Sequence, residues 1–437
     1  MLTPDELSVS TLGPRTIESP LRLSTTGGDG IGDYTPDDAR MLFRPDFTPE
    51  IPINAGLSFE KAGPREFLYF DPASTKAAIV TCGGLCPGLN NVIRSVFFQL
   101  HHNYGVREVL GIRYGYRGLN PAHGTPPVKL TPEYVDSIHK LGGTVLGSSR
   151  GPENPSVIAD FLEHNRVNIL FCIGGDGTQR GAHAIAEEIA RRGLKIAVVG
   201  IPKTIDNDLC YVWRSFGYNT ALDEAREVLD GAHAEARGVP NGISLVKLMG
   251  RHAGFIAAGA TMASQEVNFT LIPEVPFELE GEHGFLACLK KRMIARGHAV
   301  IVVAEGAGQD LLAAYPAGKD ASGNVLLQDI GPFLRQAILD YFTREKIAVS
   351  VKYFDPSYMI RSVPANTDDA LLCDRLARNA VHAAMAGKTD VLIGLWYNTF
   401  IHVPIGLVVR EKKHLAPESE VWMSVLATTG QPARFGR

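Results

Sequence analysis

A short segment near the middle of the chain combines side chains that suit phosphoryl transfer. Residues 202–208 read Pro-Lys-Thr-Ile-Asp-Asn-Asp, so a cation, a hydroxyl and two carboxylates stand close together at Lys203, Thr204, Asp206 and Asp208. A kinase needs a carboxylate near the attacking hydroxyl, further carboxylates near its metal ion, and cations that spread the charge of the moving phosphoryl group. A solvated acidic turn can have the same composition, so this segment indicates a kinase only in combination with the other loops.

Two glycine-rich loops precede this segment. Residues 174–178 read Gly-Gly-Asp-Gly-Thr, and Asp176 is placed like a ligand of Mg²⁺, which takes one or two carboxylates plus phosphate oxygens. A plain Asp-Gly turn is the alternative. Residues 81–91 form a glycine-rich turn before a helix, where backbone N–H groups can approach a phosphate. Neither loop contains G-x-G-x-x-G or Gly-Lys-Ser/Thr, which argues against the common nucleotide folds.

Strand-like runs stand directly before these loops. Short apolar runs end in glycine-rich turns and lead into amphipathic segments, a pattern typical of βαβ units with parallel strands. The first series of strands is expected at 77–81, 109–113, 169–173 and 196–201, and the second at 243–249, 269–272, 299–304, 348–353 and 390–396. Helices are expected at 91–101, 181–192 and 220–235. Ligands of open parallel sheets bind beyond the carboxyl ends of strands, so the loops after these runs should carry the chemistry.

The predicted fold class is α/β, with two Rossmann-like lobes whose largely parallel sheets are flanked by helices. The chain has 437 residues, more than one hydrophobic core usually organises. Residues 1–70 carry turn formers and little periodicity, so we expect an N-terminal extension without chemistry. The first lobe is expected over 71–215 and the second over 216–355, with a C-terminal segment, 356–437, that completes the site and packs on the lobes.

Bulk properties exclude several classes of protein. The chain has 45% hydrophobic and 21% charged residues and a formal net charge of −4, which offers no basic field for nucleic acid. Its N-terminus is polar and acidic rather than signal-like, and no apolar run reaches the roughly 18 residues of a membrane span. The cysteines have neither zinc-site nor disulfide spacing and are expected to be reduced thiols: Cys82, Cys86, Cys172, Cys210, Cys288 and Cys373. We therefore expect a cytoplasmic protein with no nucleic-acid or membrane partner.

Five motifs, taken in order, resemble the successive signatures of the 6-phosphofructokinase family. They span roughly residues 75 to 400 of the chain. The motifs are Gly83-Gly84 with Pro87-Gly88-Leu89-Asn90; Gly174-Gly175-Asp176-Gly177-Thr178; Pro202-Lys203-Thr204-Ile205-Asp206-Asn207-Asp208; Met249-Gly250-Arg251; and Pro356-Ser357-Tyr358-Met359-Ile360-Arg361. The resemblance implies the phosphofructokinase fold, fructose 6-phosphate and ATP as substrates, Mg²⁺ as cofactor, and a homodimer or homotetramer.

The resemblance also assigns roles in a nucleotide-binding first lobe. Asp206 would be the catalytic base that accepts the proton of the sugar 1-hydroxyl. Thr204 would help to position the reacting groups, Asp208 would lie close to the metal and phosphates, and Asp176 would bind Mg²⁺. The residues that would hold ATP are Gly83, Arg150, Gly151, Gly175, Asp176, Gly177 and Thr178.

The second lobe would bind the sugar phosphate. Glu305 would accept hydrogen bonds from sugar hydroxyls, and Tyr358 with Arg361 would bind the 6-phosphate, which suits an arginine fork. The full set of substrate-binding residues that the resemblance implies is Thr204, Ile205, Asp206, Met249, Gly250, Arg251, Glu305, Tyr358, Met359, Ile360 and Arg361. At two positions where bacterial ATP enzymes place arginines for the 6-phosphate, this chain has Gly242 and Lys352.

The identity of the phosphoryl donor depends on Gly177 and Lys203. Lys203 stands where the well-known bacterial ATP enzymes have glycine, and it is shared with the pyrophosphate-using branch. Pyrophosphate users typically carry Asp at the position of Gly177, where a carboxylate would repel the α-phosphate of a nucleotide. Glycine there, together with Lys203, resembles the plant and kinetoplastid ATP-using type. ATP is therefore the predicted donor; the alternatives are a pyrophosphate-dependent enzyme and a non-catalytic regulatory homologue.

Overall fold

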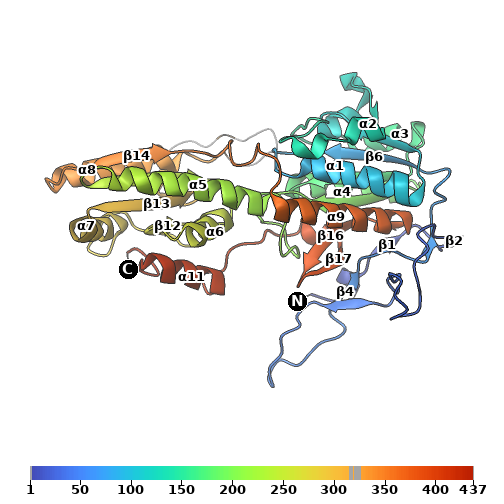
Figure 1. Cartoon of the computed structure of the whole chain (residues 1–437), viewed down its shortest axis with the longest axis horizontal. Helices are drawn as coiled ribbons and strands as arrows, with labels where there is room; N and C mark the ends of the chain where they lie inside the picture. The colour runs from blue at the N-terminus through green and yellow to red at the C-terminus, as the bar shows by residue number, and fades with distance from the viewer. Residues whose placement is uncertain (1, 314–317, 319–325, 437) are drawn as a thin grey trace. The chain divides into compact units, whose positions relative to one another are not determined.

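The computed structural model describes residues 2–313, 318 and 326–436 (Figure 1). The chain forms two compact units, each assembled from separate segments. The first unit comprises the chain up to Thr204, then Leu209–Gly217 and Ser362–Lys412. The second comprises Ile205–Asp208, Tyr218–Arg361 and the chain from Lys413 onward. Both units have the α/β architecture that the sequence predicts.

A nine-stranded sheet dominates the described part of the first unit. Its order is β3-β4-β17-β16-β10-β9-β6-β7-β8, and the strands from β16 to β7 run parallel. The bounds are β3 Arg40–Leu42, β4 Ser58–Lys61, β6 Lys76–Thr81, β7 Glu108–Ile112, β8 Val128–Lys129, β9 Ile169–Gly174, β10 Ala197–Pro202, β16 Val391–Trp396 and β17 Thr399–Pro404. The central strands are buried along nearly their whole length, as expected of a parallel sheet covered on both faces.

Helices cover both faces of this sheet. Helices α3 and α4 pack together against one face of the sheet. Their apolar side chains share one core with strand residues Ala78, Val80, Leu170, Cys172 and Val198. Helices α1 and α9 lie side by side and contact each other closely (Figure 1). The bounds are α1 Leu89–Phe98, α2 Pro132–Val135, α3 Pro155–His164, α4 Asp176–Arg191, α9 Thr367–Met385 and α10 Ile405–Val408.

The N-terminal segment is not a separate extension, because its strands pair with strands of the first unit. Strand β4 pairs with β17, and β3 pairs with β4. The short strands β1 Ser10–Thr11 and β2 Ile17–Glu18 pair with β15 Lys388–Thr389 and β5 Phe67–Leu68. Glu60 on β4 accepts buried contacts from Arg65 at 3.0 Å, His402 at 3.0 Å and Lys388 at 2.9 Å. These ionic contacts leave no periodic hydrophobic signal in the sequence.

One strand lies in a different unit from the one predicted. The run 390–396 is predicted as the last strand of the second series, but β16 pairs in parallel with β10 of the first unit, with Val199 opposite Val391 and Gly200 opposite Leu392. The chain returns to the first unit at Ser362 and passes through α9 before it forms this strand. The expectation was wrong because sequence order alone does not reveal such a return.

The second unit contains a parallel four-stranded sheet in the order β12-β13-β11-β14. Its strands are β11 Gly242–Leu248, β12 Phe269–Leu271, β13 His298–Ala304 and β14 Ser350–Phe354. Its helices are α5 Tyr218–Arg237, α6 Phe255–Ser264, α7 Phe285–Arg296, α8 Ile330–Arg344 and α11 Glu420–Thr429. Helices α7 and α8 share a core with β11, β12 and β13, while α5 contacts β11 and β13 and packs with α6 (Figure 1).

Candidate active site

The loops after β6, β9 and β10 meet at one edge of the first sheet. The strand registers align Thr81 with Ile173 and Gly174 with Pro202, so the residues that follow these strands lie beside one another. Strand β6 lies between β7 and β9, which makes the junction of β6 and β9 a point where the strand order reverses. Such switch points are where open α/β sheets bind ligands.

Three predicted residues converge at this edge. Gly83 has φ +86°, and a Cβ atom there would lie 3.2 Å from Lys203 Nζ and 3.9 Å from Thr178 Oγ1. The buried Lys203 ammonium donates to the carbonyl of Gly84 at 2.8 Å. Glycine at 83 therefore leaves room beside a cation and a hydroxyl, a combination that suits an anionic ligand.

Arg150 and Gly151 belong to a loop that is hydrogen-bonded to Gly83. The Gly83 N–H donates to Ser149 O at 3.0 Å, and the Ser148 hydroxyl donates to Gly83 O at 2.6 Å. Arg150 is exposed and Gly151 has φ +104°. The structure thus places the predicted arginine next to the first glycine-rich loop.

The second glycine-rich loop forms the start of α4. Gly175 precedes the helix, and Asp176, Gly177 and Thr178 make its first turn. Asp176 forms an ion pair with Arg180 one helical turn later. A Cβ atom added at Gly177 would meet nothing within 4 Å, so the space in front of this turn is open.

Asp176 fits the demands of Mg²⁺. It is a single carboxylate at a helix start beside open space, and Mg²⁺ is typically held by one or two carboxylates plus phosphate oxygens and water. The described residues contain no cluster of three or more His, Cys, Asp or Glu side chains arranged as a protein-only metal site. The donor set therefore suits a metal that is held jointly with phosphates.

Gln179 and Tyr116 form hydrogen bonds to the backbone at the start of α4, and neither residue was predicted from the sequence. The Gln179 side chain is fully buried, and its Nε2 donates to Gly174 O at 2.9 Å, Cys172 O at 3.3 Å and Ile201 O at 3.4 Å. The Tyr116 hydroxyl donates to Thr178 O at 2.7 Å. A polar residue directly after the Gly-Gly-Asp-Gly-Thr motif is the only sequence signal for Gln179.

The segment 202–208 passes from the first unit to the second. The Lys203 N–H donates to Gly174 O at 3.1 Å, and the Ser215 hydroxyl donates to Thr204 O at 2.7 Å, which fixes Thr204 in the first unit. Ile205–Asp208 belong to the second unit, where Asp208 O accepts the Lys413 N–H at 3.0 Å. Asp206 and Asp208 are both half-buried, and the chain bends between them at Asn207, which has φ +53°.

In the second unit, the loops after β11 and β13 are hydrogen-bonded together. The Glu305 N–H donates to Leu248 O at 2.9 Å, and the Gly306 N–H donates to Gly250 O at 3.1 Å. Burial raises the pKa of Glu305, while the charges of Arg251, Lys247 and Arg361 oppose that shift. The structure thus brings Met249–Arg251, Glu305 and Arg361 into one charged neighbourhood.

The segment after β14 presents two large side chains to solvent. Tyr358 is 74% exposed and Met359 is 72% exposed, whereas Ile360 is buried and anchors the segment. The Arg361 guanidinium carbon lies 4.7 Å from the centroid of the Tyr358 ring. An exposed aromatic beside a guanidinium suits capture of a phosphate-bearing ligand.

Lys247 is a further residue of this neighbourhood that sequence reasoning missed. Its ammonium lies 3.0 Å from Asp329 Oδ1 and 2.9 Å from Asp355 Oδ2. Its only sequence signal is a lysine near the end of an otherwise apolar strand.

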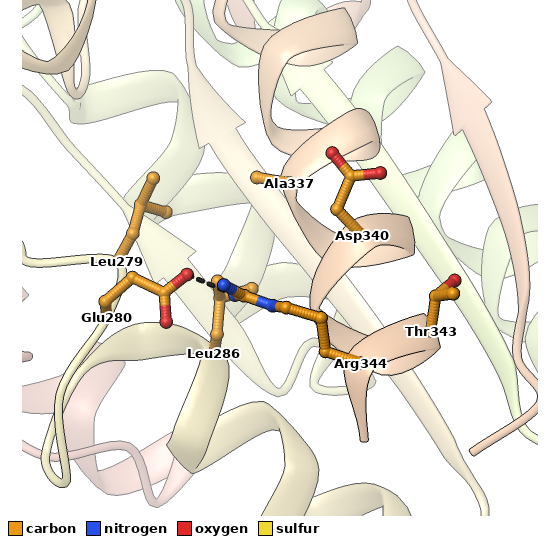
Figure 2. Close-up of a pocket in the computed structure, with 7 residues that line it drawn as sticks. All are labelled: Leu279, Glu280, Leu286, Ala337, Asp340, Thr343 and Arg344. Carbon is orange, nitrogen blue, oxygen red and sulfur yellow. Dashed lines mark hydrogen bonds and ion pairs between the residues drawn. The ribbon is translucent and has the colours of Figure 1, made fainter. Parts of the chain in front are cut away.

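A cavity of about 460 Å³ lies elsewhere in the second unit, between α7 and α8. Figure 2 shows Arg344 pointing toward Glu280 across it, and these two side chains form an ion pair. None of the predicted site residues lines this cavity, whose lining consists of Leu279, Glu280, Leu286, Ala337, Asp340, Thr343 and Arg344.

Comparison with known protein families gives one match that spans most of the chain. Residues 76–384 match the family model described as phosphofructokinase. The chain is 53% identical over 379 residues to an ATP-dependent 6-phosphofructokinase of Borreliella burgdorferi, covering 85% of each chain. It is 48% identical over 383 residues to ATP-dependent 6-phosphofructokinase 7 of Arabidopsis thaliana, covering 87% of this chain and 78% of the relative.

Solved structures share the fold at lower sequence identity. A pyrophosphate-dependent phosphofructokinase of Marinobacter aquaeolei superposes with a TM-score of 0.67 at 19% identity, covering 83% of this chain and 93% of that one. A Pichia pastoris phosphofructokinase in the T-state gives a TM-score of 0.65 at 21% identity, covering 88% of this chain, which spans 39% of that longer chain. One of these names specifies pyrophosphate as the donor and the other specifies none, so the shared fold does not identify the donor of this chain. Among the residues described here, no helix is long and apolar enough to cross a lipid bilayer.

Proposed function

The chain belongs to the phosphofructokinase family, and from that premise we propose how its residues carry out the reaction. The chain is an enzyme that transfers the γ-phosphoryl group of ATP to the 1-hydroxyl of fructose 6-phosphate, giving fructose 1,6-bisphosphate and ADP. The observation that carries the assignment is the combination of family membership with two loop clusters that lie beyond the carboxyl ends of parallel strands.

The nucleotide is held by the loop cluster of the first unit. Gly83, whose own N–H is bonded to Ser149 O, leaves space for the phosphates, the Gly175–Thr178 turn presents the N-terminus of α4 to them, and Arg150 adds a positive charge from the neighbouring loop. The start of α4 is favourable for phosphate because the first N–H groups of a helix lack partners inside the helix and its dipole is positive there. Hydrogen bonds from Gln179 to Gly174 O and from Tyr116 to Thr178 O fix the backbone of this turn, so the turn is ordered without the nucleotide.

Asp176 would hold Mg²⁺, and Asp208 would lie close to the metal and the phosphates. When bound, Mg²⁺ supplies positive charge that offsets the charge of the transferring phosphoryl group. Asp176 pairs with Arg180 through one carboxylate oxygen, so bound Mg²⁺ would compete with that ion pair or use the other oxygen. Asp176 is therefore assigned to metal binding rather than to proton transfer.

Asp206 accepts the proton of the sugar 1-hydroxyl as that oxygen attacks phosphorus. Thr204 lies two residues before it and helps to orient the reacting groups, and Ile205 between them is buried and anchors the segment. A positioned general base contributes roughly 10²–10⁴-fold to rate. The proton ends on the Asp206 carboxylate and returns to solvent when products leave.

The sugar phosphate binds to the second unit. Met249, Gly250 and Arg251 grip the sugar, Glu305 accepts hydrogen bonds from its hydroxyls, and Tyr358 with Arg361 binds the 6-phosphate. Met359 and Ile360 complete this segment, with Ile360 acting as its buried anchor. The 6-phosphate is the part of the substrate that an arginine can recognise by bidentate contact.

ATP is the donor because the space at Gly177 is open. A nucleotide needs room there for its α-phosphate and adenosine, and a Cβ atom added at this position would meet nothing within 4 Å. Lys203 beside Gly83 would also suit a small anionic donor, which keeps pyrophosphate as the second candidate. A regulatory homologue without turnover is disfavoured because Asp176, Asp206, Asp208 and Arg251 are all present.

We place the enzyme in the cytoplasm and expect a homodimer or homotetramer. The first point is supported by cysteine usage, since no disulfide joins any of the six cysteines, all of which lie within the described residues. Static light scattering of the purified chain tests the oligomer, and a monomer at micromolar concentration would contradict it.

Product identification tests the proposed function. The purified chain is incubated with ATP, Mg²⁺ and fructose 6-phosphate, and the product is analysed by phosphorus NMR. A second phosphate ester on carbon 1, formed together with ADP, is the expected result. Fructose without its 6-phosphate serves as the matched control and should react poorly. The proposal fails if no sugar bisphosphate forms with ATP.

A further inference from the structure

Lys247 occupies an unusual place for a lysine. It is the penultimate residue of β11, a strand whose other residues are all buried, and its own side chain is only 12% exposed. Its ammonium lies between two carboxylates, 3.0 Å from Asp329 Oδ1 and 2.9 Å from Asp355 Oδ2. Partly buried lysines at this distance from two carboxylates are charged and tightly held.

Each of the two carboxylates also orders a piece of backbone. Asp329 caps α8, because its Oδ1 accepts the Gly331 N–H at 3.2 Å. Asp355 accepts the Ser357 N–H at 3.2 Å through Oδ1 and also accepts the Ser357 hydroxyl. Its other oxygen, Oδ2, is the one that meets Lys247. Lys247 therefore joins the end of β11, the start of α8 and the first turn of the segment 355–361.

We propose that Lys247 is a positioning residue for the sugar-phosphate site, holding the segment 355–361 so that Tyr358 and Arg361 face the 6-phosphate. The inference rests on the proposed function, since it presumes that these two residues bind the sugar phosphate. Lys247 itself does not touch the substrate in this account. It acts through Asp355.

Lys247 holds the segment 355–361 through electrostatic attraction to Asp355. Asp329 and Asp355 both approach one ammonium to about 3 Å, so without it two partly exposed carboxylates would stand close together with no cation between them. Burial lowers the pKa of Lys247, but hydrogen bonds to Asp355 and Asp329 outweigh burial and hold it above its usual range. The pKa of Asp355 lies below its usual value because the contacts with Lys247 and Ser357 outweigh its own burial. Both members of the pair are therefore charged at neutral pH.

Lys247→Met tests the role, and Lys290→Met is its matched control. Lys290 also forms an ion pair in the second unit, with Glu345 at 2.5 Å, but none of its contacts involves the segment 355–361. We expect Lys247→Met to raise the KM for fructose 6-phosphate by about tenfold or more, the size of a lost charge-assisted contact. The kcat and the KM for ATP should stay within about threefold, and Lys247→Arg should restore most of the sugar KM. Lys290→Met should leave all three constants unchanged.

Asp355→Asn keeps the test informative if Lys247→Met does not fold. An Asn side chain can still accept from Ser357, but it lacks the charge that pairs with Lys247, so the sugar KM should rise in the same selective way. An unchanged sugar KM in a folded variant would overturn the proposal, as would an equal rise in the KM for ATP. Inactivity of the wild-type chain with ATP would instead count against the proposed function, so the two failures are distinguishable.

Discussion

The two units order their ligand loops by different physical means. In the first unit, the loops after β6, β9 and β10 are joined by hydrogen bonds to backbone carbonyls, which are donated by backbone N–H groups, the Gln179 amide, the Tyr116 hydroxyl and the Lys203 ammonium. In the second unit, the end of β11 and the segment after β14 are joined by the ammonium of Lys247 between Asp329 and Asp355. Hydrogen bonds to backbone carbonyls thus order the first cluster, whereas the second also depends on an ammonium between two carboxylates.

The difference suggests how each unit selects its ligand. Glycines in the first unit leave space, as at Gly83 and Gly177, so a donor is accepted or rejected by room and by any charge placed in that room. The second unit concentrates Arg251, Arg361, Lys247 and Glu305, so its ligand is selected by complementary charge. The following predictions test this contrast, from the largest expected effect to the smallest.

Replacing the proposed base should have the largest effect, and it should affect chemistry rather than either binding site. Asp206→Asn removes the proton acceptor at nearly constant shape, so kcat should fall by roughly 10²–10⁴-fold while both KM values change little. Steady-state kinetics measures this. Asp340→Asn, an exposed residue of α8, is the control and should be silent. Retention of more than about a tenth of wild-type kcat would remove Asp206 from this role.

Removing an arginine from the second unit should weaken the sugar site alone. Arg361→Ala and Arg251→Ala each delete a charge-assisted contact worth about 1.5–3 kcal/mol, so the KM for fructose 6-phosphate should rise by roughly 10- to 150-fold. The KM for ATP should move much less. Arg344→Ala removes an exposed arginine of the same unit, which pairs with Glu280, and should change neither constant. An unmoved sugar KM in both variants would contradict charge-based selection.

Filling the open space at Gly177 should change donor preference through charge rather than bulk. Like charges a few ångströms apart cost about 1–4 kcal/mol even with surface-like screening, so Gly177→Asp should lower the ratio of kcat/KM for ATP to that for pyrophosphate by at least about tenfold. Gly177→Ala adds a methyl group to the same open space and should leave the ratio nearly unchanged. Equal effects of both variants would show that bulk, not charge, sets the preference.

The sequence located strands better than it located their partners. Runs predicted at 77–81, 169–173 and 243–249 agree within about a residue with β6, β9 and β11, because buried parallel strands read as continuous apolar runs. The helix expected from 181 begins already at Asp176, since the glycine-rich motif itself forms its first turn. Placement of β16 was wrong because parallel pairing joins segments far apart in the chain.

The site residues that belong to sequence motifs could be predicted, whereas those whose role depends on tertiary contacts could not. Asp176, Asp206 and Arg251 stand in recognisable motifs, whereas the importance of Lys247 depends on Asp329 and Asp355, 82 and 108 residues away along the chain. The buried contacts of Glu60 with Arg65, Lys388 and His402 could not be predicted from the sequence for the same reason. Ion pairs between distant segments leave no local pattern.

The smallest expected effect concerns stability of the charged cluster. The folded-state pKa of Glu305 lies above 4.5 because of burial, so its protonated form stabilises the fold at low pH, and that stability is lost as pH rises through the folded pKa. Glu305→Gln should therefore have a Tm equal to or above that of wild type at pH 7.5, with a gap that closes near pH 4. The variant should still bind sugar more weakly. A lower Tm at pH 7.5 would contradict the account.

The central claim is that this fold, with open space at Gly177, uses ATP on fructose 6-phosphate. The most direct measurement is the initial rate of fructose 1,6-bisphosphate formation by the wild-type chain with ATP or pyrophosphate as the sole donor. We expect kcat/KM for ATP to exceed that for pyrophosphate by at least about tenfold, the scale set by one unfavourable phosphate contact. Preference for pyrophosphate would contradict the claim and make Lys203, rather than Gly177, the residue that decides the donor.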